Sequence, residues 1–187
     1  MRIGILGFGE IGRAIEELYV SVSPKEIAFK VRHKDLNKDE GIINSRYLHV
    51  CIPYSDDFVD QVCECIEKEN PDSVIIHSTV QVGTTRKIME KSGLNKICHA
   101  PVRGVHPNLF EGLKTFPMYL GYDKTWDRCG EFIKGVEFHF ARIGVKTKIV
   151  RDFETSELAK LASTTYYGMC IAFHGEMKSL CSEMGLN

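Results

Sequence analysis

Three glycines near the start of the chain have the spacing that binds a dinucleotide. Gly7, Gly9 and Gly12 follow the apolar run 2–6 and precede the helix-forming run 13–22. In that order the first glycine permits a tight turn, the second lets a pyrophosphate approach the backbone, and the third lets the helix pack on the strand. The N–H groups at the start of the helix attract the phosphates. We predict that the coenzyme is held by Gly7, Phe8, Gly9, Glu10, Ile11 and Gly12.

The end of the second predicted strand, 27–31, bears on the choice between NAD and NADP. In the Rossmann pattern an acidic residue stands there and binds the ribose 2′-hydroxyl. Here Arg32, His33 and Lys34 occupy that place, and Asp35 comes later. A basic cluster suits a 2′-phosphate, so Arg32 slightly favours NADP over NAD. The alternative is that Arg32 and Lys34 form an ordinary solvated strand end.

Strands and helices alternate along the chain up to about residue 150. Short apolar runs predict strands at 47–52, 73–77, 96–100, 117–121 and 147–150. Periodic apolar segments predict three helices: one that Asp56 caps, one that begins near Thr84, and one over 125–143. Residues 36–46 are predicted to be irregular, and residues 108–115 to form a loop or short helix. This alternation predicts an α/β fold with a Rossmann-type, doubly wound, mainly parallel sheet over residues 1–150.

Composition excludes several classes of partner. The chain has 187 residues and a net charge of -1, so we expect neither nucleic acid nor a membrane as a partner. Its seven cysteines are an odd number without paired metal-site spacing, which is typical of reduced thiols in a cytoplasmic protein. We predict no metal site.

The segment 77–88 carries a more specific motif. Its letters S-T-V-Q-V-G-T-T resemble the S-T-V-P-V-G-T-T of the UDP-glucose/GDP-mannose dehydrogenases, within the 6-phosphogluconate dehydrogenase-like superfamily, with Gln81 in place of proline. The resemblance implies that Thr79 lies near the nicotinamide half of NAD or NADP. Pro53, which ends an apolar strand, suits a loop that passes along the coenzyme. The alternative is that the segment is a threonine-rich turn that caps a helix near Thr84.

The segment 100–107, A-P-V-R-G-V-H-P, mixes motifs of several dehydrogenases. It resembles the S-P-E-R motif of the sugar-nucleotide enzymes, with Val102 in place of a catalytic glutamate. It is also similar to the A-P-V-S-G-G motif of the 3-hydroxyisobutyrate dehydrogenases and to the Gly-x-His-Pro of prephenate dehydrogenase. Arg103 and His106 beside a nicotinamide would bind an anionic small-molecule substrate. Alternatively, Arg103 pairs with a local acid and His106 caps a loop.

The last segment, 151–187, is predicted to form a long helix over 156–184. Its letters 157–164, E-L-A-K-L-A-S-T, resemble the family's E-L-x-K-L-x-x-N. The resemblance implies that Lys160 is the catalytic lysine and that Thr164 replaces a supporting asparagine. The alternative is a surface lysine paired with Glu157 or Glu154.

Mainly apolar residues recur at helical spacing along this segment: Leu158, Ala162, Thr165, Met169, Ala172 or Phe173, Leu180 and Met184. A helix of about 40 Å is too long for one small domain to cover. The resemblance implies that it forms a dimer core, so we expect a homodimer through this helix; the alternative is a fragment of a longer protein.

Together these features predict an NAD(P)-dependent oxidoreductase. It would transfer a hydride between a nicotinamide and an alcohol group of a small or sugar-based anionic substrate. The resemblance assigns no thiol nucleophile among the seven cysteines. The alternative is a non-catalytic homologue that binds a nicotinamide or nucleotide, because Val102 and Thr164 both depart from the family's motifs.

Overall fold

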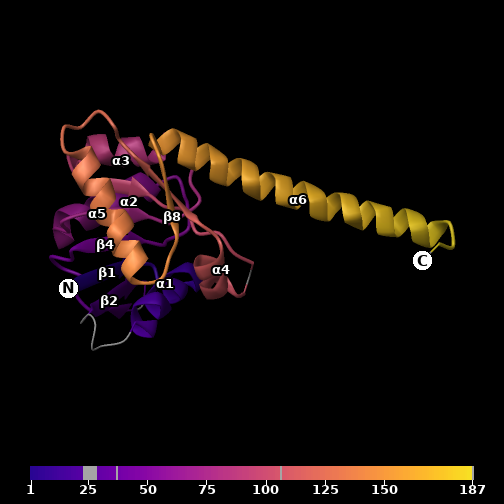
Figure 1. Cartoon of the computed structure of the whole chain (residues 1–187), viewed down its shortest axis with the longest axis horizontal. Coiled ribbons are helices and arrows are strands. Elements are labelled where there is room, and N and C mark those ends of the chain that lie inside the picture. The colour runs from indigo at the N-terminus through magenta and orange to yellow at the C-terminus, as the bar shows by residue number, and fades with distance from the viewer. Residues whose placement is uncertain (23–28, 37, 106, 187) are drawn as a thin grey trace.

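The fold is built outward from β1 (Arg2–Leu6), a buried strand near the centre of the sheet. The computed structural model describes residues 1–22, 29–36, 38–105 and 107–186. Within them one sheet has the order β3-β2-β1-β4-β5-β6-β7-β8 (Figure 1). β1 pairs in parallel with both β2 (Lys30–Asp35) and β4 (Tyr47–Val50), so the chain winds outward from β1 in two directions.

The remaining strands complete a mainly parallel sheet. On the far side of β4 lie β5 (Val74–Ile76), β6 (Ile97–His99), β7 (Met118–Tyr122) and β8 (Thr147–Val150). The pairs β6–β7 and β2–β3 are antiparallel, with β3 at Lys38–Asp39, and the other pairs are parallel. The predicted Rossmann-type, doubly wound architecture is therefore confirmed.

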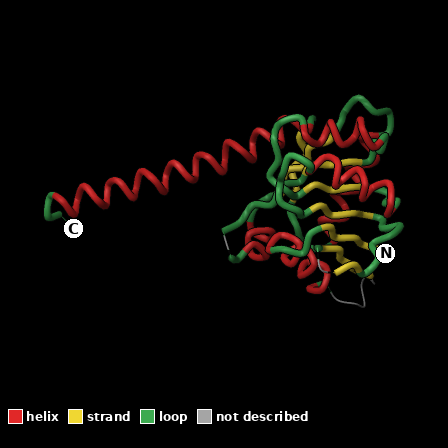
Figure 2. Tube along the Cα trace, turned by 180° about the vertical axis from the view of Figure 1, so that it is seen from behind, coloured by secondary structure: helices red, strands yellow, loops and turns green. Residues whose placement is uncertain are grey.

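Helices cover both faces of the sheet (Figure 2). Apolar residues of α1 (Glu10–Ser21), α4 (Leu109–Thr115) and α5 (Cys129–Arg142) share one core with β1. Those of α2 (Phe58–Glu69) and α3 (Thr84–Ser92) form a second core with β4 and β5 on the opposite face. This two-sided burial explains why β4 and β5 are apolar without alternation.

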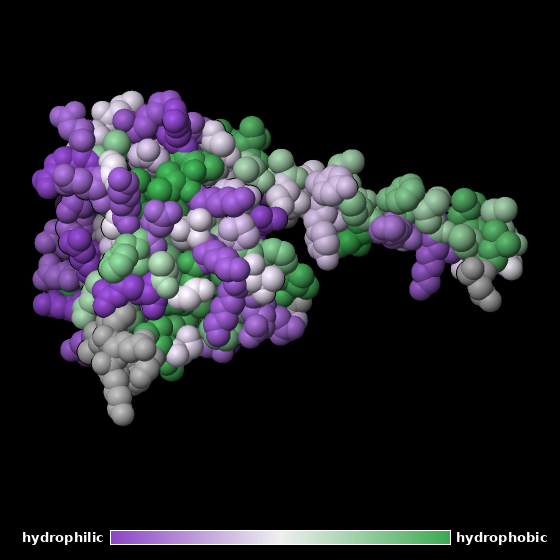
Figure 3. All heavy atoms as spheres, in the orientation of Figure 1, coloured by the Kyte–Doolittle hydropathy of each residue, from purple (hydrophilic) through white to green (hydrophobic). Residues whose placement is uncertain are grey.

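The last helix, α6 (Phe153–Glu183), begins on the sheet and then leaves it (Figure 1). Asp152 caps it by accepting the Thr155 N–H at 2.6 Å. Phe153 and Glu157 are fully buried, whereas large apolar side chains beyond the first turns are exposed, including Tyr166 at 70% and Phe173 at 60%. The space-filling view shows hydrophobic residues, in green, along the protruding helix (Figure 3). Of the helices in the described residues, none is long and apolar enough to cross a lipid bilayer.

Three predicted boundaries are wrong. The second strand runs over Lys30–Asp35 rather than 27–31, of which residues 27 and 28 lie outside the described residues. The predicted irregular segment 36–46 contains β3, which pairs with β2. The predicted helix 125–143 begins at Cys129 because the Asp123 carboxylate accepts the N–H and hydroxyl of Thr125, at 2.9 and 2.8 Å, and holds it in a turn.

The predicted helix cap at Asp56 is also wrong. Asp57 holds the N-cap position of α2 and makes no side-chain cap bond to the helix. Its carboxylate accepts instead from the Ser55 hydroxyl at 2.6 Å and from the Gln61 amide at 2.7 Å. Sequence spacing alone does not separate these two adjacent aspartates.

Candidate functional site

The carboxyl ends of the parallel strands bring four predicted site segments to one edge of the sheet. The glycine loop follows β1, Pro53 follows β4, Thr79 follows β5 and Arg103 follows β6. Pro53 is exposed and Thr79 is half-buried. The Ser78 hydroxyl donates to the Ile52 carbonyl at 2.6 Å and so ties two of these loops together. In an open α/β sheet this edge is where ligands bind.

Of the three glycines in the loop, only Gly9 has open space where a Cβ would lie. Gly7 has φ +89°, and a Cβ there would lie 2.8 Å from the Ile52 nitrogen. A Cβ at Gly12 would lie 2.1 Å from the Gly7 carbonyl oxygen, so the fold itself requires glycine at both places. A Cβ at Gly9, in contrast, would meet no heavy atom of the described residues within 4 Å. Gly9 thus leaves open space before the first turn of α1, which fits the phosphates of a dinucleotide.

The other loop residues support this geometry in different ways. The Phe8 N–H donates to the Asp35 carboxylate at 2.6 Å, and the Phe8 ring stacks on His33 with ring centres 3.8 Å apart. Ile11 is half-buried against the core, and Glu10 is exposed at the start of α1. Phe8 and Ile11 therefore fix the loop, while Glu10 lies on its open side.

The acidic residue expected in a Rossmann fold is present, but later than the sequence pattern indicated. Because β2 extends to Asp35, this carboxylate lies at the end of the strand, beside the glycine loop. Hydrogen bonds from the Phe8 and Leu36 N–H groups lower its pKa and keep it ionised. Arg32 lies three residues earlier, and its guanidinium donates to the Glu40 carbonyl at 2.9 Å. The structure does not bring Arg32 to the loop.

Lys160 lies where α6 passes the end of β6. Its Nζ donates to the Val102 carbonyl at 3.1 Å, and the residue is half-buried. Burial is the main cause that lowers the Lys160 pKa, and the positive charge of Arg103 lowers it further. A lysine in this state exchanges a proton more readily near neutral pH than an exposed one.

The remaining predicted site residues are arranged less directly. The Thr164 hydroxyl donates to the backbone carbonyl of Lys160 at 2.9 Å, not to its amine. The Arg103 guanidinium packs over the rings of Phe116 and Tyr119, 5.6 and 5.7 Å from their centres. His106 lies outside the described residues.

Neither glutamate considered as a partner for Lys160 is free to pair with it. Glu157 is fully buried and accepts the Gly83 and Thr85 N–H groups at 2.6 and 2.8 Å and the Thr85 hydroxyl at 2.6 Å. Glu154 pairs with Arg86 at 2.5 Å. Glu157 thereby caps α3 and ties α6 to the T-V-Q-V-G-T-T loop. The sequence motif around Glu157 does not predict its contact with Thr85, because the two residues are 72 positions apart.

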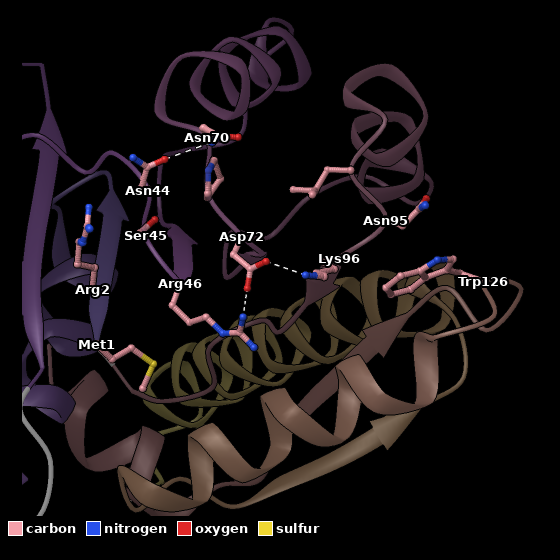
Figure 4. A pocket seen from close by; sticks show the side chains of 12 residues that line it. Met1, Arg2, Asn44, Ser45, Arg46, Asn70, Asp72, Asn95, Lys96 and Trp126 are labelled. Carbon is pink, nitrogen blue, oxygen red and sulfur yellow. Dashed lines mark hydrogen bonds and ion pairs between the residues drawn. The ribbon is translucent and has the colours of Figure 1, made fainter.

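A separate hollow of about 780 Å³ lies at the opposite, amino-terminal edge of the sheet (Figure 4). Its wall includes Trp126, and Asp72 pairs there with both Arg46 and Lys96. None of the predicted site residues that the structure describes lines it. The candidate site is therefore the carboxyl edge.

Comparisons with known proteins bear on the fold and the class of the chain. No protein-family profile matches the chain. It is 28% identical to the UDP-N-acetyl-D-mannosamine dehydrogenase of Methanocaldococcus jannaschii, over 99% of this chain and 49% of that protein. Its fold is similar to the UDP-N-acetyl-mannosamine dehydrogenase Cap5O of Staphylococcus aureus, with a TM-score of 0.70 at 16% identity over 98% of this chain and 55% of the other. The 3-hydroxyisobutyrate dehydrogenase of Mycobacterium tuberculosis gives a TM-score of 0.70 at 13% identity, over 100% of this chain and 66% of the other.

These similarities define the class as a Rossmann domain of dehydrogenase type. More particularly, the chain is similar to the NAD(P)-binding half of UDP-sugar dehydrogenases, which agrees with the resemblance found in its motifs. It spans about half the length of the UDP-N-acetyl-mannosamine dehydrogenases that it matches.

Proposed function

We propose that the protein is an NAD(P)-dependent dehydrogenase that acts on an alcohol group of an anionic substrate. The observation that carries the proposal is the position of Lys160. Its amine is held 3.1 Å from the Val102 carbonyl, beside Arg103 and at the same edge as the glycine loop. A proton-transfer group, a cation and a dinucleotide loop are the three parts that such a reaction needs.

Lys160 acts as the general base in the oxidation. A nicotinamide held at the glycine loop would supply the acceptor for the hydride that leaves the alcohol carbon. Neutral Lys160 takes the hydroxyl proton, and in the reverse direction its ammonium returns that proton. The lowered pKa of Lys160 favours the neutral form. Thr164 supports the lysine indirectly, because its hydroxyl bonds the Lys160 backbone carbonyl.

The coenzyme we propose is NAD, in contrast to the NADP that the sequence slightly favoured. Asp35 ends β2 next to Phe8 of the glycine loop, and it is ionised. A carboxylate there accepts hydrogen bonds from ribose hydroxyls but repels a 2′-phosphate. Arg32, the residue proposed to hold that phosphate, is engaged by the Glu40 carbonyl.

The substrate is an anion, and nucleotide sugars are the first compounds to test. Arg103, with His106 as the second predicted ligand, would bind a phosphate or carboxylate. UDP-sugars are among the compounds to test because relatives of this chain are named UDP-N-acetyl-D-mannosamine dehydrogenases. Val102 stands at the position of a catalytic glutamate, so the expected reaction is a single hydride transfer from an alcohol rather than oxidation to an acid.

The partner we propose is a second copy of this chain, packed along α6. The apolar stripe on the exposed part of this helix consists of Ala162, Tyr166, Met169, Phe173, Met177, Leu180 and, at its C-cap, Met184. The steps between them are 4, 3, 4, 4, 3 and 4 residues, which read the same in both directions from Phe173. An antiparallel copy aligned at Phe173 therefore sets an apolar residue against each of these seven. The residues just past the end of the partner's helix would then lie level with Lys160.

Replacement of Lys160 tests the proposed activity. We expect Lys160→Met to abolish NADH formation that the wild-type protein shows with one member of a panel of UDP-sugars and small hydroxy acids. Lys178→Met, a change of the same type at an exposed position on α6, should retain it. Equal turnover by Lys160→Met and the wild type would contradict the assignment. Coenzyme binding without turnover on the whole panel would favour the non-catalytic alternative, for which the orientation of the Thr164 hydroxyl is the structural argument.

A further inference from the structure

Four buried side chains, one each from α1, α5 and β4 and one that directly follows β5, form one continuous hydrogen-bonded chain. His139 Nε2 lies 2.7 Å from the hydroxyl of Tyr19, which lies 2.6 Å from His49 Nε2. His49 Nδ1 lies 2.8 Å from His77 Nε2, and His77 Nδ1 lies 2.6 Å from the carbonyl oxygen of Ala100. None of the four side-chain residues is more than 3% exposed. The chain thus runs from α5 across β4 to the loop that follows β6.

The carbonyl at one end determines where every proton in the chain lies. A carbonyl only accepts, so His77 Nδ1 carries a hydrogen. Burial lowers the pKa of His77 to about 4, and it lowers those of His49 and His139 as well, so all three rings are neutral at pH 7. His77 Nε2 must then accept from His49 Nδ1–H, and His49 Nε2 must accept from the Tyr19 hydroxyl.

The other end of the chain agrees with this order. The Tyr19 hydroxyl has given its only proton to His49, so its oxygen accepts from His139 Nε2–H. His139 Nδ1 is left as a bare acceptor. It is the atom of the chain that is buried without a hydrogen-bond partner among the described residues.

The hydrogen-bonded chain ends on the loop after β6, and Lys160 donates to the same loop. Ala100 also donates its N–H to the Ile76 carbonyl at 2.8 Å, and two residues later the Val102 carbonyl accepts from Lys160. On the other face of the sheet, the Ser156 hydroxyl of α6 lies 2.5 Å from Nδ1 of His99. The end of β6 is therefore held on both faces.

We propose that His77, with the ordered chain behind it, is a positioning residue that holds the 100–102 backbone as the seat for the Lys160 amine. The proposal rests on the proposed role of Lys160. It adds that the position of the 100–102 backbone depends on the fixed tautomers and hydrogen-bond directions of the side chains from His77 to His139. In this arrangement His77 acts through the Ala100 carbonyl and does not contact the substrate.

The first test is independent of any activity. Side-chain ¹⁵N correlation spectra of the intact wild-type protein at pH 7 should show His49 and His77 protonated at Nδ1 and His139 at Nε2. A mixture of tautomers at His77, or protonation of its Nε2, would overturn the proposal. Because no coenzyme or substrate is needed, this result does not depend on whether the protein is a dehydrogenase.

The second test asks whether the chain positions Lys160. His77→Asn keeps an N–H near the position of Nδ1, whereas His77→Phe removes it. We expect the Lys160 pKa, followed by ¹³C NMR of the dimethylated amine, to rise in His77→Phe and to stay near the wild-type value in His77→Asn. With an active substrate, kcat/KM should fall by about tenfold or more in His77→Phe and recover in His77→Asn. The same Lys160 pKa in both folded variants and the wild type would overturn the positioning role, whereas an inactive wild type would contradict only the proposed function.

Discussion

The carboxylate of Glu157 is the strongest single connection between α6 and the rest of the domain. It is fully buried, and its two oxygens accept three hydrogen bonds at the start of α3, with lengths from 2.6 to 2.8 Å. In Glu157→Gln the volume is kept and one acceptor oxygen remains. The other oxygen becomes an amide that faces an N–H donor, and the negative charge at the helix N-terminus is lost.

The expected cost follows from these two losses. A buried hydrogen bond to a charged group contributes about 1.5 to 3 kcal/mol. A negative charge at a helix N-terminus contributes about 0.3 to 1 kcal/mol more. We therefore expect Glu157→Gln to lower the free energy of unfolding by about 3 kcal/mol. For a chain of this length that corresponds to a fall in Tm of about 6 to 12 °C.

Urea unfolding measures this loss directly. Fluorescence of Trp126, the single tryptophan of the chain, and far-ultraviolet circular dichroism should give the same transition. Glu176→Gln is the matched control, because Glu176 is exposed on the same helix. We expect this control to stay within about 0.5 kcal/mol of the wild type. Equal midpoints for the two variants would refute the argument that Glu157 joins α6 to α3.

Three further predictions concern the coenzyme, pH and assembly. Wild-type protein should bind NAD⁺ more tightly than NADP⁺, and Asp35→Asn should narrow that difference by about tenfold in a calorimetric titration; tighter NADP⁺ binding by the wild type would restore the Arg32 hypothesis. Because burial lowers the pKa values of His77, His99 and His139 to between about 3 and 4, the unfolded chain binds more protons than the folded one between pH 6.5 and 4. Stability should therefore fall as pH falls through that window, by up to about 1.4 kcal/mol per unit for each histidine, and urea midpoints that stay constant from pH 7 to 5 would contradict this. Phe173→Asp should convert a dimer into a monomer in light scattering, whereas Lys178→Met should not; a monomeric wild type would exclude the α6 pairing.

The order of elements could be predicted from the sequence because the apolar runs of β4, β5 and β6 are buried on both faces and therefore unmistakable. β2 could not be placed because its residues Lys30–Asp35 are mostly charged and only half-buried, so periodicity gives no signal. Its charged side chains pair with residues far away in the sequence, as Lys34 does with Glu69 at 2.8 Å. The apolar run before it drew the predicted strand toward the N-terminus.

The candidate site was predictable to the extent that short motifs carry it. The glycine loop and Lys160 were found because their chemistry lies in neighbouring letters. Asp35 was missed as the acidic residue at the strand end because the predicted strand 27–31 ended four residues too early. The contacts of Glu157 and of the Tyr19–His139 pair join residues 72 and 120 positions apart, so no local pattern reports them.

Coenzyme binding at Gly9 tests the central claim most directly. A Cβ at Gly9 would meet no heavy atom of the described residues within 4 Å, and Gly9 has a φ of -74°, so Gly9→Val should fold with a Tm close to that of the wild type, lowered only by the poorer helix cap that valine makes. The same side chain would fill the space proposed for the pyrophosphate. We predict that NAD⁺ binds the wild type in a calorimetric titration and that Gly9→Val weakens this binding by at least about tenfold. Equal affinity in the two proteins, or no binding of any nicotinamide coenzyme to the wild type, would contradict the account.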